Sequence, residues 1–235
     1  MPEPRCALES LERGEPMLGT ATHVDSYLLV EHNGPWPRDA IAGSEMSAQV
    51  RDWLSSYDGS VLLIRRPNRP TGPVHVFEAR PEALRGVVLD SLEELPGQIP
   101  SEWPELSESL WLVCTHGKRD ACCAKFGRPV VDALAAVDAD ATWEVSHIGG
   151  HRFAGNVLVL PSGEVYGRVP PDLAPAAVLG QHPELLRGVC WLSPRDQVSQ
   201  SMGGEAVQTA LSSGRLSCRD DEPSPISAWL LPAAD

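Results

Sequence analysis

Short apolar segments predict that strands build most of the first half of the chain. Each segment combines branched or aromatic side chains with turn-forming residues nearby, as strands commonly do. The predicted strands are residues 26–31 (SYLLVE), 60–65 (SVLLIR), 74–78 (VHVFE) and 86–89 (GVVL). Helical periodicity predicts helices over 7–13 and 47–57. The Pro-rich segment 95–105 follows, so we expect residues 1–105 to form an N-terminal α/β half.

The pattern starts again with a strand at 110–113 that ends at Cys114. The predicted elements after it are a helix over 122–136, strands at 143–145, 156–160 and 164–166, and a helix over 172–180. This order of strand, helix, strand, strand and helix is typical of a small α/β layer fold. We therefore expect a domain over residues 106–187, followed by a C-terminal helix and polar tail over residues 188–235.

Charge and composition narrow the class of protein. The 235 residues include 19 Lys and Arg against 32 Asp and Glu, a formal net charge of −13. This balance argues against a nucleic-acid-binding protein, which usually presents a basic face. No apolar run approaches the roughly 20 residues of a membrane span, and the N-terminus lacks the apolar core of a signal peptide. We expect a cytoplasmic protein that does not associate with membranes.

The six cysteines are unevenly distributed along the chain. Cys114, Cys122 and Cys123 fall within ten residues, whereas the others, which we expect to be structural or incidental, are Cys6, Cys190 and Cys218. In a reducing compartment, cysteines grouped with histidines are better interpreted as metal ligands or redox groups than as disulfides. A strand end at Cys114 and a helix start near Cys122 would present these thiols at the rim of the sheet. A helix N-terminus also stabilises a thiolate.

A second group of candidate ligands follows in His147-Ile-Gly-Gly-His151. The adjacent glycines favour a loop in which both histidines approach a bound group. Two cysteines with two histidines are compatible with a zinc site, a mixed-ligand [2Fe-2S] cluster or thiol–disulfide chemistry. The run Cys114-Thr-His116 has one half of a Rieske-type motif, but the second half is missing. The spacing of these residues does not distinguish between the three interpretations.

Two segments, CTHGKRDACCAKFGRPV (114–130) and SHIGGHRFAGNVLVLPSGEVYGRV (146–169), resemble the sucrase/ferredoxin-like family of thioredoxin-like ferredoxins. The resemblance implies a thioredoxin-like layer fold in the C-terminal half, with the N-terminal α/β half packed on it. It also implies a [2Fe-2S] cluster, and by position its ligands would be Cys114, Cys123, His147 and His151. Because the cysteine is doubled, Cys122 stays an alternative to Cys123.

The implied function is electron transfer by a redox carrier rather than by a stand-alone enzyme. Two imidazole ligands would raise the reduction potential and couple reduction to proton uptake. The chain has no nucleotide-binding fingerprint, so we expect a separate electron donor or reductase. An acidic partner could dock on the basic patch, defined as Lys118, Arg119, Lys125 and Arg128. The alternatives are a zinc-stabilised interaction module and a thiol oxidoreductase.

Overall fold

The computed structural model describes residues 5–194 and 196–197, so most of the C-terminal helix and polar tail expected over residues 188–235 lies outside the described residues. Within these residues, nine strands form one mixed sheet in the order β4-β3-β1-β2-β6-β5-β7-β8-β9. The strands are β1 (Tyr27–Glu31), β2 (Ser60–Arg65), β3 (Val74–Arg80), β4 (Ala83–Leu89), β5 (Leu110–Cys114), β6 (Thr142–Val145), β7 (Val157–Leu160), β8 (Glu164–Tyr166) and β9 (Leu186–Val189). The helices are α1 (Arg5–Glu12), α2 (Ala48–Ser55), α3 (Ala121–Ala135) and α4 (Ala174–Ala177), with short 3-10 turns η1 (Leu92–Glu94), η2 (Pro100–Glu102), η3 (His151–Phe153) and η4 (Pro183–Leu185).

The sheet consists of two units with the same strand order. In the first unit β1 and β2 are parallel with α2 between them, β3 is antiparallel to β1, and β4 is antiparallel to β3. In the second unit β5, α3, β6, β7 and β8 repeat this arrangement. The α/β class predicted from the sequence is confirmed. The repeat is one of topology, because the sequence contains no evident internal repeat.

The two units join through an antiparallel pairing of β2 with β6. Arg65 of β2 lies opposite Glu144 of β6, and its Nε and Nη2 donate hydrogen bonds of 3.0 and 2.6 Å to Glu144 Oε2. The Thr115 hydroxyl donates a third hydrogen bond, 2.6 Å long, to the same oxygen. The N-terminal half is thus continuous with the C-terminal sheet.

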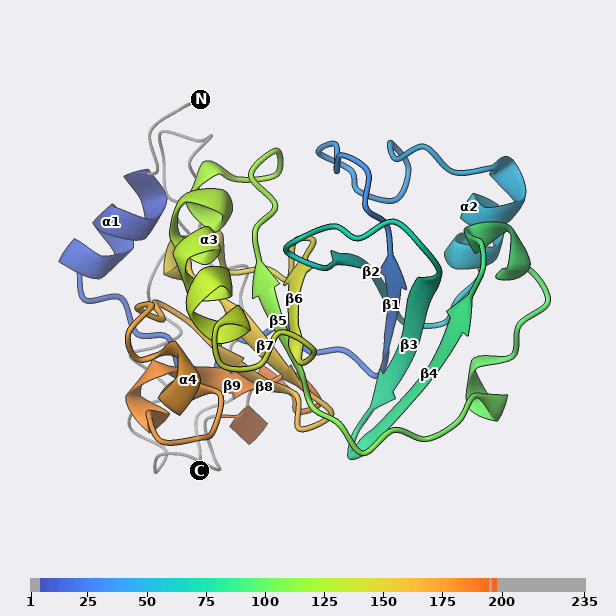
Figure 1. Ribbon diagram of the computed structural model, residues 1–235. Coiled ribbons are helices and arrows are strands. Elements are labelled where there is room, and N and C mark those ends of the chain that lie inside the picture. Colours follow the sequence, from blue (N-terminus) through green and yellow to red (C-terminus); the bar gives the residue numbers. More distant parts are fainter. Residues whose placement is uncertain (1–4, 195, 198–235) are drawn as a thin grey trace, which may run out of the picture.

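Apolar side chains cover both faces of this sheet. A central cluster draws on both units and includes Leu29, Ile64, Leu112, Val145 and Leu158. On the other face, one cluster lies beneath α3 and α4 and another beneath α2. Figure 1 shows α3 across the C-terminal strands with α1 beside it, while α2 lies at the opposite end of the molecule. Cys114 and Cys123 both belong to the central cluster, so the candidate site borders the core.

The structure differs from the sequence-based expectation in the last described elements. The helix expected over 172–180 has only the four residues of α4: Pro175 favours a start at Ala174, because its ring would clash with a carbonyl four residues earlier in a helix that began sooner, and Gly180, with φ +74°, ends the helical turns. Strand β9 was not expected, since its four residues include Gly188. No helix within the described residues is long and apolar enough to cross a membrane.

Candidate metal centre

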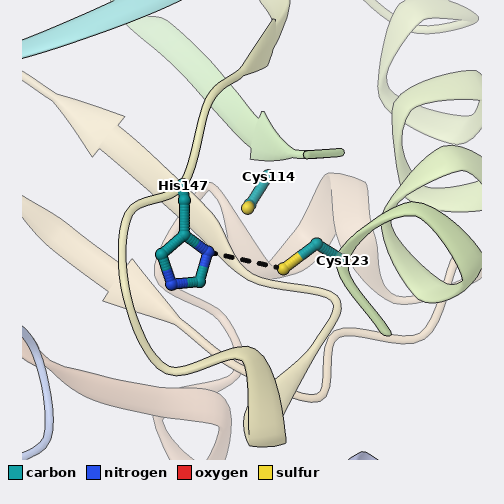
Figure 2. Close-up of side chains that lie close together, drawn as sticks. All are labelled: Cys114, Cys123 and His147. Atoms are coloured by element: carbon teal, nitrogen blue, oxygen red, sulfur yellow. Dashed lines mark hydrogen bonds between the residues drawn. The ribbon is translucent and has the colours of Figure 1, made fainter. Parts of the chain in front are cut away.

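Three of the predicted ligands meet at the carboxyl end of β5 (Figure 2). Cys114 is the last residue of β5, Cys123 lies in the first turn of α3, and His147 follows β6. Their candidate ligand atoms all lie within 4.8 Å of one another. The Nδ1 atom of His147 points toward Cys123 and lies 3.7 Å from its Sγ. Because β5 and β6 are parallel neighbours, their carboxyl ends bring the thiol and the imidazole together.

Local structure fixes the position of Cys123. Asp120 is the N-cap of α3, and its side chain accepts a hydrogen bond of 2.9 Å from the backbone N–H of Cys122. This contact begins the helix immediately before the two cysteines. Gly127, one turn further along α3, lies so close to the carbonyl oxygen of Cys114 that a Cβ atom would collide with it. Close helix–strand packing therefore brings Cys123 toward Cys114.

The two buried thiols shift each other's pKa. A hydrogen bond donated by the Cys123 thiol, supported by His147 and by the backbone N–H of His116, lowers the pKa of Cys114 well below its ordinary value despite burial. The hydrogen bond to Cys114 and burial raise the pKa of Cys123 well above its ordinary value. These directions favour a thiolate at Cys114, the form in which a cysteine binds a metal ion.

His151 lies beside this group without joining it. Its ring stacks on that of His147 with 5.7 Å between the centroids. Its Nε2 atom lies 3.8 Å from Asp120 Oδ2, and a candidate ligand atom of His151 falls within 4.8 Å of those of Asp120 and Cys6. Both imidazoles are partly exposed, whereas the thiols of Cys114 and Cys123 are buried. The site thus has a buried sulfur side and an outward-facing imidazole side.

Cys122 and His116 point elsewhere. The sulfur of Cys122 lies 3.2 Å from that of Cys6 in α1, in a cluster separate from the one that holds Cys114. His116 is buried, and its Nε2 lies 2.7 Å from the carbonyl oxygen of Pro37. Burial lowers the pKa of His116, which keeps its imidazole neutral.

Sequence reasoning missed a buried cation behind the histidine loop. Arg187 of β9 is 1% exposed and donates four hydrogen bonds, to the carbonyl and hydroxyl oxygens of Thr20, to Gly149 O and to Asn156 Oδ1. All four acceptors are uncharged, and no carboxylate in the described part of the chain forms an ion pair with it. Burial, followed by the charge of Arg152, lowers the pKa of Arg187, while Cys114 and Cys123 act in the opposite direction. Thiolates at the site would therefore compensate this buried charge.

Asn156 forms hydrogen bonds with three parts of the site. Its carbonyl oxygen accepts the N–H of Cys114 at 3.0 Å, and its Nδ2 donates to the carbonyl oxygen of Gly150 at 2.9 Å. Its Oδ1 accepts Nη1 of Arg187 at 2.8 Å. One fully buried residue, through its backbone carbonyl and its side-chain amide, thus links the strand of Cys114, the histidine loop and the cation.

The chain matches one family model and is similar in part to several curated proteins. A family model described as sucrase/ferredoxin-like matches residues 17–183. Among curated proteins, "altered inheritance of mitochondria protein 32" from Debaryomyces hansenii is 39% identical over 79 residues, which is 29% of this chain and 29% of that protein. The protein of the same name from Candida glabrata is 40% identical over 60 residues, 23% of this chain and 19% of that protein. The chain therefore matches less than a third of the length of either relative.

Among solved structures, a variant of the thioredoxin-like [2Fe-2S] ferredoxin from Aquifex aeolicus is similar to part of the chain. It is 19% identical in sequence, with a TM-score of 0.26 over 30% of this chain and 83% of that protein.

Proposed function

This chain belongs to the sucrase/ferredoxin-like family, and from that premise we propose that it is an electron-transfer protein. The proposed [2Fe-2S] cluster is held by Cys114, Cys123, His147 and His151. The observation that carries the proposal is the convergence of two buried thiols and an imidazole within 4.8 Å, with the second imidazole stacked beside the first. When bound, such a cluster supplies one-electron transfer.

The chemistry of the residues fits this group. Cysteine thiolates and histidine imidazoles are the ligands found in mixed-ligand [2Fe-2S] centres. The lowered pKa of Cys114 favours the thiolate, the form in which a cysteine binds a metal ion. The unpaired charge of Arg187 supports an anionic ligand set, since a buried cation gains from nearby negative charge. His151 would join the set by turning away from Asp120, its partner at 3.8 Å.

The two sides of the site have different roles. The buried thiols of Cys114 and Cys123 keep water from the sulfur side. The partly exposed rings of His147 and His151 provide the edge that faces solvent and thus an electron partner. Neutral imidazoles in place of two thiolates leave the site less negative, so an electron is accepted more easily. Proton uptake on reduction stays a prediction.

A separate electron donor would approach the basic patch of Lys118, Arg119, Lys125 and Arg128. All four side chains are exposed, in the loop and first turns that lead from Cys114 into α3. In a chain with net charge −13, this local positive charge would steer an acidic partner. The expected cytoplasmic location stays a prediction, because the name of the curated relatives refers to mitochondria.

Metal analysis of anaerobically purified protein tests the proposal. We expect about two irons and two acid-labile sulfides per chain with visible charge-transfer absorption. His147→Ala and His151→Ala should each change that absorption. His182→Ala is the matched control, because His182 pairs with Glu184 at 2.7 Å and lies outside the site. One zinc per chain without colour, or a spectrum indifferent to both site histidines, would overturn the assignment.

A further inference from the structure

A second pair of sulfur atoms lies next to the candidate metal centre and takes no part in it. The Sγ atoms of Cys6 and Cys122 are 3.2 Å apart, although the residues are separated by 116 positions in the chain. Cys6 is 1% exposed and Cys122 is fully buried. Around them pack Ala7, Ala154 and the ring of Phe126, and the Cys6 thiol also donates to the buried carboxylate of Asp120, with 4.0 Å between Sγ and Oδ1.

Helix α1 is fixed over this pair by polar contacts on the same side of the molecule. Glu15, just after α1, accepts a hydrogen bond of 2.6 Å from Nε of Arg152 in η3. Nη2 of Arg168 donates to the carbonyl oxygen of Ser10 at 2.9 Å and to its hydroxyl oxygen at 2.8 Å. These contacts place α1 against η3, which begins at His151. The helix therefore covers the flank of the site where His151 lies.

We propose that Cys6 and Cys122 form a reversible disulfide, a redox site distinct from the proposed cluster ligands, that fastens α1 to the first turn of α3. The pair can reach bonding distance by closing a gap of about 1 Å, from the observed 3.2 Å to the roughly 2.05 Å of an S–S bond. The inference stands whether or not an iron–sulfur cluster is bound, because neither sulfur belongs to the group formed by Cys114, Cys123 and His147.

A shared metal ion explains the sulfur–sulfur distance less well. Asp120 and His151 lie near enough to Cys6 to suggest one, since their candidate ligand atoms fall within 4.8 Å. Two thiolates on one tetrahedral zinc ion stay about 3.8 Å apart, given Zn–S bonds of about 2.3 Å. The observed 3.2 Å is shorter, which favours direct sulfur–sulfur chemistry.

The oxidant in this proposal is a low-molecular-weight disulfide such as glutathione disulfide. One cysteine thiolate attacks a sulfur of the small disulfide, forming a mixed disulfide and releasing one glutathione thiol. The second cysteine attacks the mixed disulfide and releases the other glutathione thiol. Two protein thiols are thereby oxidised to one disulfide, and the small disulfide is reduced to two thiols that take up the two protons.

Access to the buried pair requires α1 to leave its place. The helix has only eight residues, and its outer side chains Leu8 and Leu11 are exposed. A short helix with exposed apolar side chains opens locally at lower free energy than the sheet. The disulfide would then hold α1 in its observed position beside His151.

Peptide mapping of the full-length protein tests this proposal. The protein is equilibrated in glutathione buffers of increasing oxidation, alkylated and digested with trypsin. We expect a disulfide between peptides 6–13 and 120–125 with the alkyl group on Cys123, lost on reduction and accompanied by the loss of two alkylatable thiols. The link should persist in Cys190→Ser, the matched control, which removes a buried cysteine of the central cluster. It should vanish in Cys6→Ser and in Cys122→Ser.

If a variant fails to fold, peptide mapping of the protein without substitutions still tests the proposal. A link that maps to Cys123 rather than Cys122 overturns the proposal, as does full alkylation of Cys6 and Cys122 at the most oxidising ratio. So does one zinc ion per chain that is lost in Cys6→Ser. Iron and sulfide content measured on the same samples reports separately on the proposed cluster.

Discussion

Replacing Gly150 by alanine should disrupt the histidine loop through the buried cation behind it. Gly150 has φ +69°, a left-handed conformation that L-residues with a Cβ adopt only with strain. A Cβ at this position would also lie 2.5 Å from Nη1 of Arg187 and would overlap Nη2 and Cζ. The substitution therefore combines backbone strain with displacement of a guanidinium that is fixed by hydrogen bonds.

Gly180 separates these two effects. It has φ +74°, nearly the same backbone strain, and an added Cβ would meet nothing within 4 Å. Gly180→Ala should therefore lower the free energy of unfolding by only about 1 kcal/mol.

The additional cost at Gly150 follows from the hydrogen bonds of Arg187. Its Nη1 and Nη2 atoms donate three of its four bonds, to Gly149 O at 3.3 Å, Asn156 Oδ1 at 2.8 Å and Thr20 O at 2.6 Å. Losing two bonds from a charged donor costs about 3–6 kcal/mol. With the strain included, Gly150→Ala should lower the free energy of unfolding by about 4–7 kcal/mol.

Urea unfolding followed by circular dichroism measures these differences. Arg187→Met removes the guanidinium with which the methyl group added by Gly150→Ala would collide. The loss in free energy of unfolding should therefore be much smaller in the double variant than the sum of the losses in the two single variants. Equal destabilisation by Gly150→Ala and Gly180→Ala would refute the reasoning. Full additivity of Gly150→Ala with Arg187→Met would refute it as well.

Other contacts give predictions that the same unfolding assay can check. Arg65→Met should lower the free energy of unfolding by about 3–5 kcal/mol, because it leaves the charge of Glu144 buried without its partner. Replacing both residues by apolar ones should lower it by less, and equal losses would contradict the argument. Ser47→Ala should lower the free energy of unfolding by about 1 kcal/mol, because it removes the N-cap of α2. An unchanged midpoint of urea unfolding would contradict this. Burial raises the pKa of Glu31, but hydrogen bonds from His75 outweigh it and leave the pKa below its ordinary value. Since a lowered folded-state pKa stabilises above the unfolded-state pKa, the advantage of Glu31 over Glu31→Gln should be largest above about pH 5 and fade as the pH falls through and below about 4.3. A constant difference from neutral to acid pH would show that this pKa shift is absent.

The sequence predicts much of this fold because most elements carry a local signal. The buried strands β1, β2 and β5 consist of nearly continuous apolar residues, as strands covered on both faces do. Helix α3 begins at Asp120, whose short carboxylate is a typical N-cap. The grouping of Cys114, Cys123 and His147 could be expected because strand ends and the following helix start lie at one edge of the sheet.

Residues whose roles depend on distant parts of the chain gave no such signal. Arg187 lies in a four-residue strand that contains a glycine, and its importance comes from Thr20 and Asn156, which are far away in sequence. The sequence predicts only a structural or incidental role for Cys6, since nothing near it indicates its contact with Cys122. Such pairings follow from how the elements pack, which no local pattern encodes.

The seam between the two units also determines which sheet edges the chain leaves open. In either unit alone, β2 or β6 would be an edge strand with unpaired backbone groups available to other chains. In the whole chain the pairing of β2 with β6 removes both of these edges, and Arg65 and Glu144 are paired with each other across it. Either unit produced separately would lose it, so the two units depend on each other for colloidal stability as well as for their shared core.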